Sequence, residues 1–269
     1  MNNFFIATTL SAASLLNWGG PGVLQKETAN VYSKLSDNVV MLIQPDGSSG
    51  GSGSHVEIPG KGVFIMTNNH VCHSRKPYLS TKKGETQRYM IAKKTDGSIS
   101  RVKILFATGG TPDICFLEAS QPTGLKISES KLPVANQIVI SAGHPILSTF
   151  SKTWGKAGPV EKFDIQDECA ERKVKDSKDS RPVNKTGKVL PFFSGEVSRK
   201  GFGKSCVTVQ RGQQTGMVAL PGSSGSPVVN GKGEVVGAIF AGDGAYAFAI
   251  IVPLDEVWKT ITEFTAQYP

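Results

Sequence analysis

Residues 220–237 read LPGSSGSPVVNGKGEVVG, and this stretch decides how the rest of the chain is interpreted. Two serines stand between glycines, ahead of Pro227 and of two apolar runs joined by a Gly-containing turn. Glycines beside a serine allow a tight turn that exposes the hydroxyl and directs neighbouring N–H groups into one small space. An acyl-transfer nucleophile needs this arrangement. It also needs an adjacent base, because a serine hydroxyl alone is a weak nucleophile, so the chain must supply a histidine and a carboxylate.

Candidates for both groups occur upstream. His70 lies in TNNHV, where a strand is predicted to end, so its ring would lie at the rim of a sheet. Asp113 stands between a polar loop and the apolar run ICFL, and a carboxylate buried there needs a partner such as a protonated imidazole. Taken singly, His70 is compatible with a structural or surface role and Asp113 with a turn. His73 falls in the basic stretch HSRK, and His144, before Pro145, is interpreted as a turn residue.

Composition excludes several classes of function. The 269-residue chain carries a net charge of +8, but its lysines are scattered and no basic–aromatic motif occurs, so we expect no nucleic-acid partner. No apolar stretch of about 20 residues exists, so no stable membrane span is predicted. The four cysteines form no CxxC pair, which argues against a structural zinc site.

The cysteines leave two interpretations open, buried thiols or one or two disulfides. They are Cys72, Cys115, Cys169 and Cys206. The first two each lie two residues after the candidate base and the candidate acid, and for this pair we favour small buried thiols packed under the site.

The first 36 residues are treated as a separate segment. Residues 4–18 are apolar enough for the core of a signal peptide, yet no Lys or Arg precedes them. The alternative is an N-terminal helix packed on the domain. A signal peptide would place the protein in the periplasm or outside the cell, and its absence would leave a cytoplasmic or virus-associated location.

Short strands dominate the remaining pattern. Strands are predicted at 38–44, 55–58, 62–67, 101–107, 114–117, 137–142, 196–198, 205–209, 217–220 and 245–252. A TDGS turn is predicted at 95–98, a surface loop at 46–54 and a charged, solvated excursion at 156–188. Helices are expected at 26–37 and, from the apolar spacing, at 254–264. This pattern predicts an all-β sandwich or a pair of barrels.

Together, the motifs TNNHV, TPDICFL and GSSGSP resemble those of the trypsin-like serine proteases, and within them the HtrA (DegP) group. The same features occur in the same order: a Gly-Ser-rich loop, a strand into TNNHV, an Asp leading an apolar strand, and GxSG followed by VVN. Weaker agreement comes from GSGS at 51–54, GHP at 143–145, SGEVS at 194–198 and AFAI at 247–250. The resemblance covers roughly residues 37–264.

The resemblance implies a trypsin-like fold of two six-stranded antiparallel β-barrels with a C-terminal helix, in a protease domain at 37–269. The first barrel would span about 37–133, the second about 134–253, and the helix 254–264. No PDZ domain follows in this sequence, in contrast to most HtrA proteins. Ser226 replaces the usual second glycine after the nucleophile, which a small residue can do without loss of activity.

The resemblance also implies the site of a serine endopeptidase that needs no metal or cofactor and acts on proteins or peptides. Ser224 would be the nucleophile, His70 the general base and acid, and Asp113 the group that orients His70. The N–H groups of Gly222 and Ser224 would form the oxyanion hole. Substrate would contact Val218, Phe240, Ala241, Gly242 and Ala247, with Ala249 on the same pocket wall; with no acidic residue at the pocket base, small or apolar side chains are favoured.

Three alternatives follow from the same residues. One is a protease-like binding module without activity. A second keeps the protease but assigns it to viral polyprotein processing. A third, an α/β-hydrolase esterase, is excluded because its histidine follows the serine in the chain, whereas here the histidine comes first.

Overall fold

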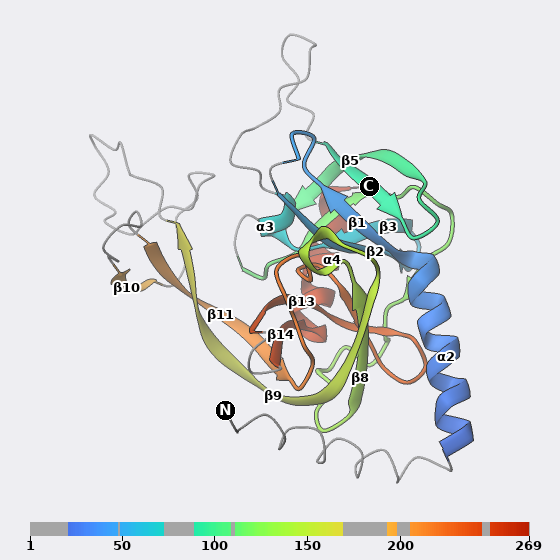
Figure 1. Cartoon of the computed structure of the whole chain (residues 1–269). Coiled ribbons are helices and arrows are strands. Elements are labelled where there is room, and N and C mark those ends of the chain that lie inside the picture. Colours follow the sequence, from blue (N-terminus) through green and yellow to red (C-terminus); the bar gives the residue numbers. More distant parts are fainter. Residues whose placement is uncertain are drawn as a thin grey trace, which may run out of the picture.

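The computed structural model describes residues 21–47, 49–72, 89–108, 111–168, 193–197, 205–243 and 248–268. The predictions for residues 4–18, His73, Cys169 and Ala247 lie outside these ranges. Within them, the strands form two sheets, one from each half of the chain (Figure 1).

The first sheet closes into a six-stranded barrel. Its strands are β1 (Val39–Ile43), β2 (Gly50–Ile58), β3 (Gly62–Thr67), β4 (Tyr89–Lys94), β5 (Ile99–Ala107) and β6 (Cys115–Glu118). They run in the order β1-β4-β5-β6-β3-β2, and β2 pairs back with β1, so every pairing in the ring is antiparallel. The short β7 (Leu125–Lys126) adds to β2 in parallel. The predicted TDGS turn joins β4 to β5.

The second sheet closes in the same way. Its strands are β8 (Ile138–Gly143), β9 (Ser151–Glu168), β11 (Ser205–Thr215), β12 (Pro227–Val229), β13 (Val235–Asp243) and β14 (Phe248–Pro253). The ring β11-β14-β13-β12-β8-β9 is closed by the β9–β11 pairing, and β10 (Phe193–Val197) lies outside it on β11. In Figure 1, β9 and β11 continue past the barrel as a long two-stranded ribbon. The predicted pair of six-stranded antiparallel barrels is therefore confirmed.

The two long helices each contact the barrel encoded farther away in the sequence. Helix α4 (Leu254–Gln267) follows the last strand of the second barrel, yet its Phe264 stacks on Phe116 and meets the edge of Phe64, both in the first barrel. Helix α2 (Pro21–Asn38) precedes the first barrel, and Lys34 donates to the carbonyl of Lys232 in the turn between β12 and β13. The apolar spacing predicted α4 correctly, since Leu254, Val257, Ile261 and Phe264 are buried. No helix among the described residues is long and apolar enough to cross a membrane.

Three local predictions are wrong. Gly50–Ser54 belongs to β2 instead of a surface loop, because only small residues fit there: a Cβ on Gly53 would lie 2.8 Å from the Leu42 side chain and 3.0 Å from that of Ile65. Residues 156–168 are strand and no irregular excursion, because they continue β9 and pair with β11, although most of residues 156–163 are exposed or half-buried. Residues 217–220 form no strand.

Candidate active site

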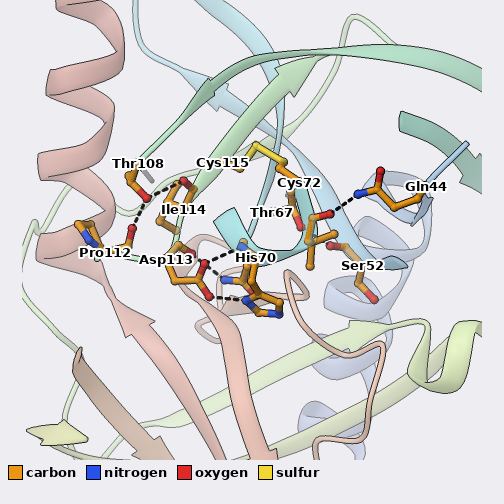
Figure 2. Close-up of a disulfide and its surroundings, with 12 residues drawn as sticks. Gln44, Ser52, Thr67, His70, Cys72, Thr108, Pro112, Asp113, Ile114 and Cys115 are labelled. Atoms are coloured by element: carbon orange, nitrogen blue, oxygen red, sulfur yellow. Dashed lines mark hydrogen bonds and ion pairs between the residues drawn. A yellow bond between two sulfur atoms is a disulfide. The ribbon is translucent and has the colours of Figure 1, made fainter. Parts of the chain in front are cut away.

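His70 and Asp113 meet at one end of the first barrel. Helix α3 (Asn69–Cys72) carries His70 directly after β3, and Asp113 precedes β6, the neighbour of β3. The His70 Nδ1 atom lies 2.5 Å from Asp113 Oδ2, and the His70 backbone N–H donates to Oδ1 at 2.9 Å (Figure 2). Asp113 Oδ2 is the acceptor of this bond and the Nδ1–H group of His70 is its donor, which leaves Nε2 on the side of the ring away from the carboxylate.

Burial differs across this pair. The Asp113 side chain is 10% exposed and the His70 side chain 47% exposed. The carboxylate is therefore held in the protein while the imidazole reaches solvent, which is the arrangement in which a carboxylate orients a base.

Asn68 fixes the backbone of the acidic residue. This fully buried side chain donates from Nδ2 to the Asp113 carbonyl oxygen at 2.8 Å. The Asn68 carbonyl also accepts from the N–H groups of Val71 and Cys72, which closes the turn of α3. One asparagine thus ties the His70 helix to the segment that carries Asp113.

A disulfide joins Cys72 to Cys115, which corrects the prediction of two buried thiols. Each cysteine lies two residues after a member of the His70–Asp113 pair. Thr67 of β3 pairs with Cys115 of β6, so the residues beside the pair are already neighbours across the sheet, and the disulfide links the same two segments covalently (Figure 2).

Residues 220–226 carry the predicted nucleophile and are called the nucleophile loop below; they lie before β12 of the second barrel. Gly222 has φ +91° and Gly225 φ +85°, conformations that favour glycine. Ser223 is buried, and its Oγ accepts from the Leu220 N–H at 3.2 Å, whereas Ser224 is only partly buried. The loop therefore uses Ser223 within its own turn and leaves Ser224 as the more accessible hydroxyl.

Backbone contacts bring the nucleophile loop to the His70 end of the first barrel. The Ser52 N–H donates to the Ser224 carbonyl oxygen at 2.7 Å. A Cβ on neighbouring Gly51 would lie 2.8 Å from that same oxygen and 2.8 Å from the Val71 side chain, which adjoins His70. The described residues show no hydrogen bond between Ser224 Oγ and the His70 ring, and bonds between reacting side chains often tighten only when a substrate is bound.

The N–H groups of Gly222 and Ser224 make no hydrogen bond with any part of the chain that the structure describes. The carbonyls of their own peptide groups are engaged: Pro221 O accepts from Ile146 N–H, and Ser223 O accepts from Ser226 N–H at 3.0 Å. A trans peptide directs its N–H opposite to its C=O, so these bonds set the direction of both donors.

The predicted substrate-binding residues differ in how exposed their side chains are. Val218 is 43% exposed, while the Phe240 side chain is buried in the core. Ala241 and Gly242 continue β13, where β14 is the one strand paired with them among the described residues. A Cβ on Gly242 would lie 2.5 Å from the Ala219 side chain, so the segment after Val218 and this strand are adjacent.

Two other histidines are buried outside the pair. His55, fully buried in β2, donates from Nδ1 to Asn38 O at 3.1 Å and meets Ser120 Oγ through Nε2 at 2.9 Å; burial lowers its pKa to about 4. Burial also lowers the pKa of His144, whose Nδ1 lies 3.0 Å from Ser148 O. Both rings are therefore neutral near pH 7.

Sequence reasoning did not identify Ser52 and Asn68 as parts of this site. Ser52 lies in GSGS, which is predicted as part of a loop. Asn68 lies in TNNHV, in which only His70 is predicted as a site residue. No group of three or more potential metal ligands occurs among the described residues.

Comparison with known proteins identifies the family of the chain. The family profile described as "Trypsin-like peptidase domain" matches residues 51–237. No sequence relative was found among curated proteins. Among solved structures, the Rv3671c protease of M. tuberculosis, in an inactive mutant form, is 14% identical, with 93% of this chain and 96% of that chain covered and a TM-score of 0.58.

Two further structures share the fold. The serine endoprotease from Yersinia pestis is 16% identical over 87% of this chain and 65% of its own, with a TM-score of 0.54. The HtrA-type protease AlgW, bound to a tripeptide, is 16% identical over 87% of this chain and 62% of its own, with a TM-score of 0.55. The chain belongs to the trypsin-like peptidase family and is a serine endopeptidase, a hydrolase of proteins or peptides.

Proposed function

We propose that this endopeptidase cleaves peptide bonds through Ser224, His70 and Asp113, by way of an acyl-enzyme. The observation that supports this most directly is the doubly hydrogen-bonded His70–Asp113 pair at the barrel end where the Ser224 backbone docks. We also propose residues 37–269 as the protease domain, with the cleft between the barrels as the substrate site.

In the proposed reaction, Ser224 Oγ attacks the substrate carbonyl carbon while His70 Nε2 takes the hydroxyl proton. Asp113 holds the ring through Nδ1 and stabilises the imidazolium. The N–H groups of Gly222 and Ser224 donate to the oxyanion, each at about 3 kcal/mol. His70 then passes the proton to the leaving amine, and water repeats the sequence to release the acyl group from Ser224.

Labelling with a fluorophosphonate probe tests the nucleophile. We expect the wild type to label, Ser224→Ala to lose all label, and Ser223→Ala to keep it, since the Ser223 hydroxyl is used within the turn. Label that survives in Ser224→Ala, or a wild type that folds but never labels, would contradict the assignment.

We further propose that the residue before the cut is small or apolar. Val218 is exposed beside the Ala219–Gly242 contact, and no acidic side chain is predicted at the pocket base. Ala241 and Gly242 would pair with the substrate backbone as an added strand. A peptide library with one varied position should yield Ala or Val, and not Lys or Arg, at that site.

A further inference from the structure

We infer that Ser52, in the first barrel, is a positioning residue for the oxyanion hole in the second barrel. This inference rests on the proposed function, because it concerns the N–H groups of Gly222 and Ser224. Bonds within the loop and from Ile146 hold the peptides that carry these N–H groups, and Ser52 adds bonds from the first barrel to the carbonyls of the same two residues.

The need for outside support comes from Gly222. Its φ of +91° and its missing Cβ allow the peptide groups on either side of it to rotate at little cost. A rotation of either group would turn the Gly222 N–H away from the oxyanion position. The peptide before Gly222 is fixed by the bond from Ile146 N–H to Pro221 O. The peptide after it is held on its N–H side, because Ser223 N–H donates to Leu220 O at 2.9 Å, and its carbonyl side is left for a group outside the loop.

Ser52 supplies that group. Its hydroxyl donates to the Gly222 carbonyl oxygen at 2.8 Å and accepts from the His144 N–H at 2.8 Å. Because the incoming bond from His144 occupies an acceptor site of the hydroxyl, the hydroxyl proton is directed at Gly222. Ser52 has no exposed surface, so water does not compete for these bonds.

The backbone of Ser52 supports the same loop at a second point. Its N–H donates to the Ser224 carbonyl oxygen at 2.7 Å, and its own carbonyl accepts from Thr67 Oγ1 at 2.7 Å. One residue of β2 therefore holds the carbonyls of both residues that provide the oxyanion donors. Thr67, three residues before His70, holds Ser52 in turn, so the donors and the base share one support.

The chain offers a matched control in Ser54. It lies two residues farther along β2 with no exposed surface, and its Oγ has no hydrogen-bond partner among the described residues. Ser54→Ala therefore removes an equally buried hydroxyl from the same strand without touching the nucleophile loop.

The test compares Ser52→Ala with Ser54→Ala in the full chain, with peptide hydrolysis, inhibitor binding and amide NMR as readouts. For Ser52→Ala we expect kcat to fall by about 10- to 100-fold with KM within about twofold, somewhat less than the loss of an oxyanion donor itself. Affinity for a peptide boronic acid, which forms a tetrahedral adduct, should fall by the same factor as kcat. Affinity for a peptide amide of the same sequence, which forms no adduct, should stay unchanged. The Gly222 and Ser224 amide resonances should shift in Ser52→Ala and stay in place in Ser54→Ala.

Equal effects of the two variants, or a kcat loss explained entirely by a lower fraction of folded enzyme, would overturn the inference. The NMR comparison separates this failure from failure of the proposed function. If the wild type does not label at Ser224, the amide shifts still decide whether Ser52 positions Gly222 and Ser224, and unchanged shifts would refute it.

Discussion

The two halves of the site are held in different ways. The His70–Asp113 half is fixed within its own barrel by two hydrogen bonds between the pair, by Asn68 and by the Cys72–Cys115 disulfide. The nucleophile loop instead depends on segments outside its own turn, among them Ser52 of the other barrel.

The two halves of the site therefore depend on different contacts. The hydrogen bonds between His70 and Asp113 lie entirely within the first barrel. The loop that carries Ser224 also bonds to β2 of the first barrel, so we expect its arrangement to depend on contact between the two barrels. The following predictions test this contrast, from the largest expected effect to the smallest.

The first prediction concerns Asp113→Asn. An asparagine amide carries no charge and can present an N–H group to the ring, so it would no longer fix the tautomer of His70. We therefore expect kcat to fall by about 10⁴-fold, while the melting temperature changes little. Steady-state kinetics and thermal unfolding measure the two effects. A fall below tenfold would show that Asp113 does not orient His70.

The second prediction concerns Gly225→Ala in the nucleophile loop. A Cβ there would collide with the Ser52 carbonyl and Thr67 Oγ1, at a residue with φ +85°, so the loop could not dock on β2. We expect activity to fall by at least 100-fold and the unfolding free energy to fall by about 3–5 kcal/mol.

Gly60→Ala is the control for this variant. Gly60 has φ +73° and open space around its Cβ position, so an alanine there would experience the backbone strain without the collision. Its cost should be about 1–2 kcal/mol, with full activity. Equal losses in the two variants would remove the argument that docking on β2 matters.

The third prediction concerns the disulfide. In Cys72→Ser/Cys115→Ser the unfolding free energy should fall by about 2–4 kcal/mol. Activity per folded molecule should fall by less than tenfold, because the hydrogen bonds of His70, Asp113 and Asn68 remain. Denaturant unfolding with active-site titration measures both. A complete loss of activity in folded protein would show that the disulfide, and not the hydrogen bonds, sets the geometry of this half.

The fourth prediction concerns acid. His55 has a pKa of about 4 in the folded protein and near 6.5 when unfolded, so the unfolded state binds the extra proton between these values. The contribution of His55 to the unfolding free energy should be constant above pH 6.5 and fall by about 3 kcal/mol as the pH drops toward 4. His55→Gln should show a shallower slope in denaturant unfolding across that range; an unchanged slope would exclude His55 as the source.

The smallest expected effect belongs to the substrate pocket. Val218→Asp should raise kcat/KM for a Lys-containing peptide relative to its Ala counterpart by about tenfold, through one partly solvated ion pair. Both halves of the catalytic arrangement should be unaffected, so fluorophosphonate labelling of Ser224 should persist. No change in preference would place Val218 outside the pocket.

Sequence patterns predicted most of the fold but fewer of the supports of the site. The order of three motifs along the chain predicted His70, Asp113 and the pair of barrels. Gly50–Ser54 was predicted as a loop because glycine and serine have low strand propensity, whereas barrel closure requires small residues there. Because these residues are predicted as a loop, the sequence predicts no role for Ser52.

The disulfide was missed for a different reason. The positions of Cys72 and Cys115 relative to His70 and Asp113 are visible in the sequence, but spacing does not determine pairing. Only the register of β3 against β6 shows that the two cysteines are neighbours.

The contact of α4 with the first barrel has a consequence for the order in which the chain is made. Translation completes the strands of the first barrel early, but Phe64 and Phe116 lack their aromatic neighbour until Phe264 has been synthesised. Since Phe264 lies in the helix that follows the last strand of the second barrel, this aromatic packing on the first barrel forms only after every strand of the second barrel has been synthesised. A growing chain therefore carries the complete set of first-barrel strands before it carries the aromatic residue that packs on Phe64 and Phe116.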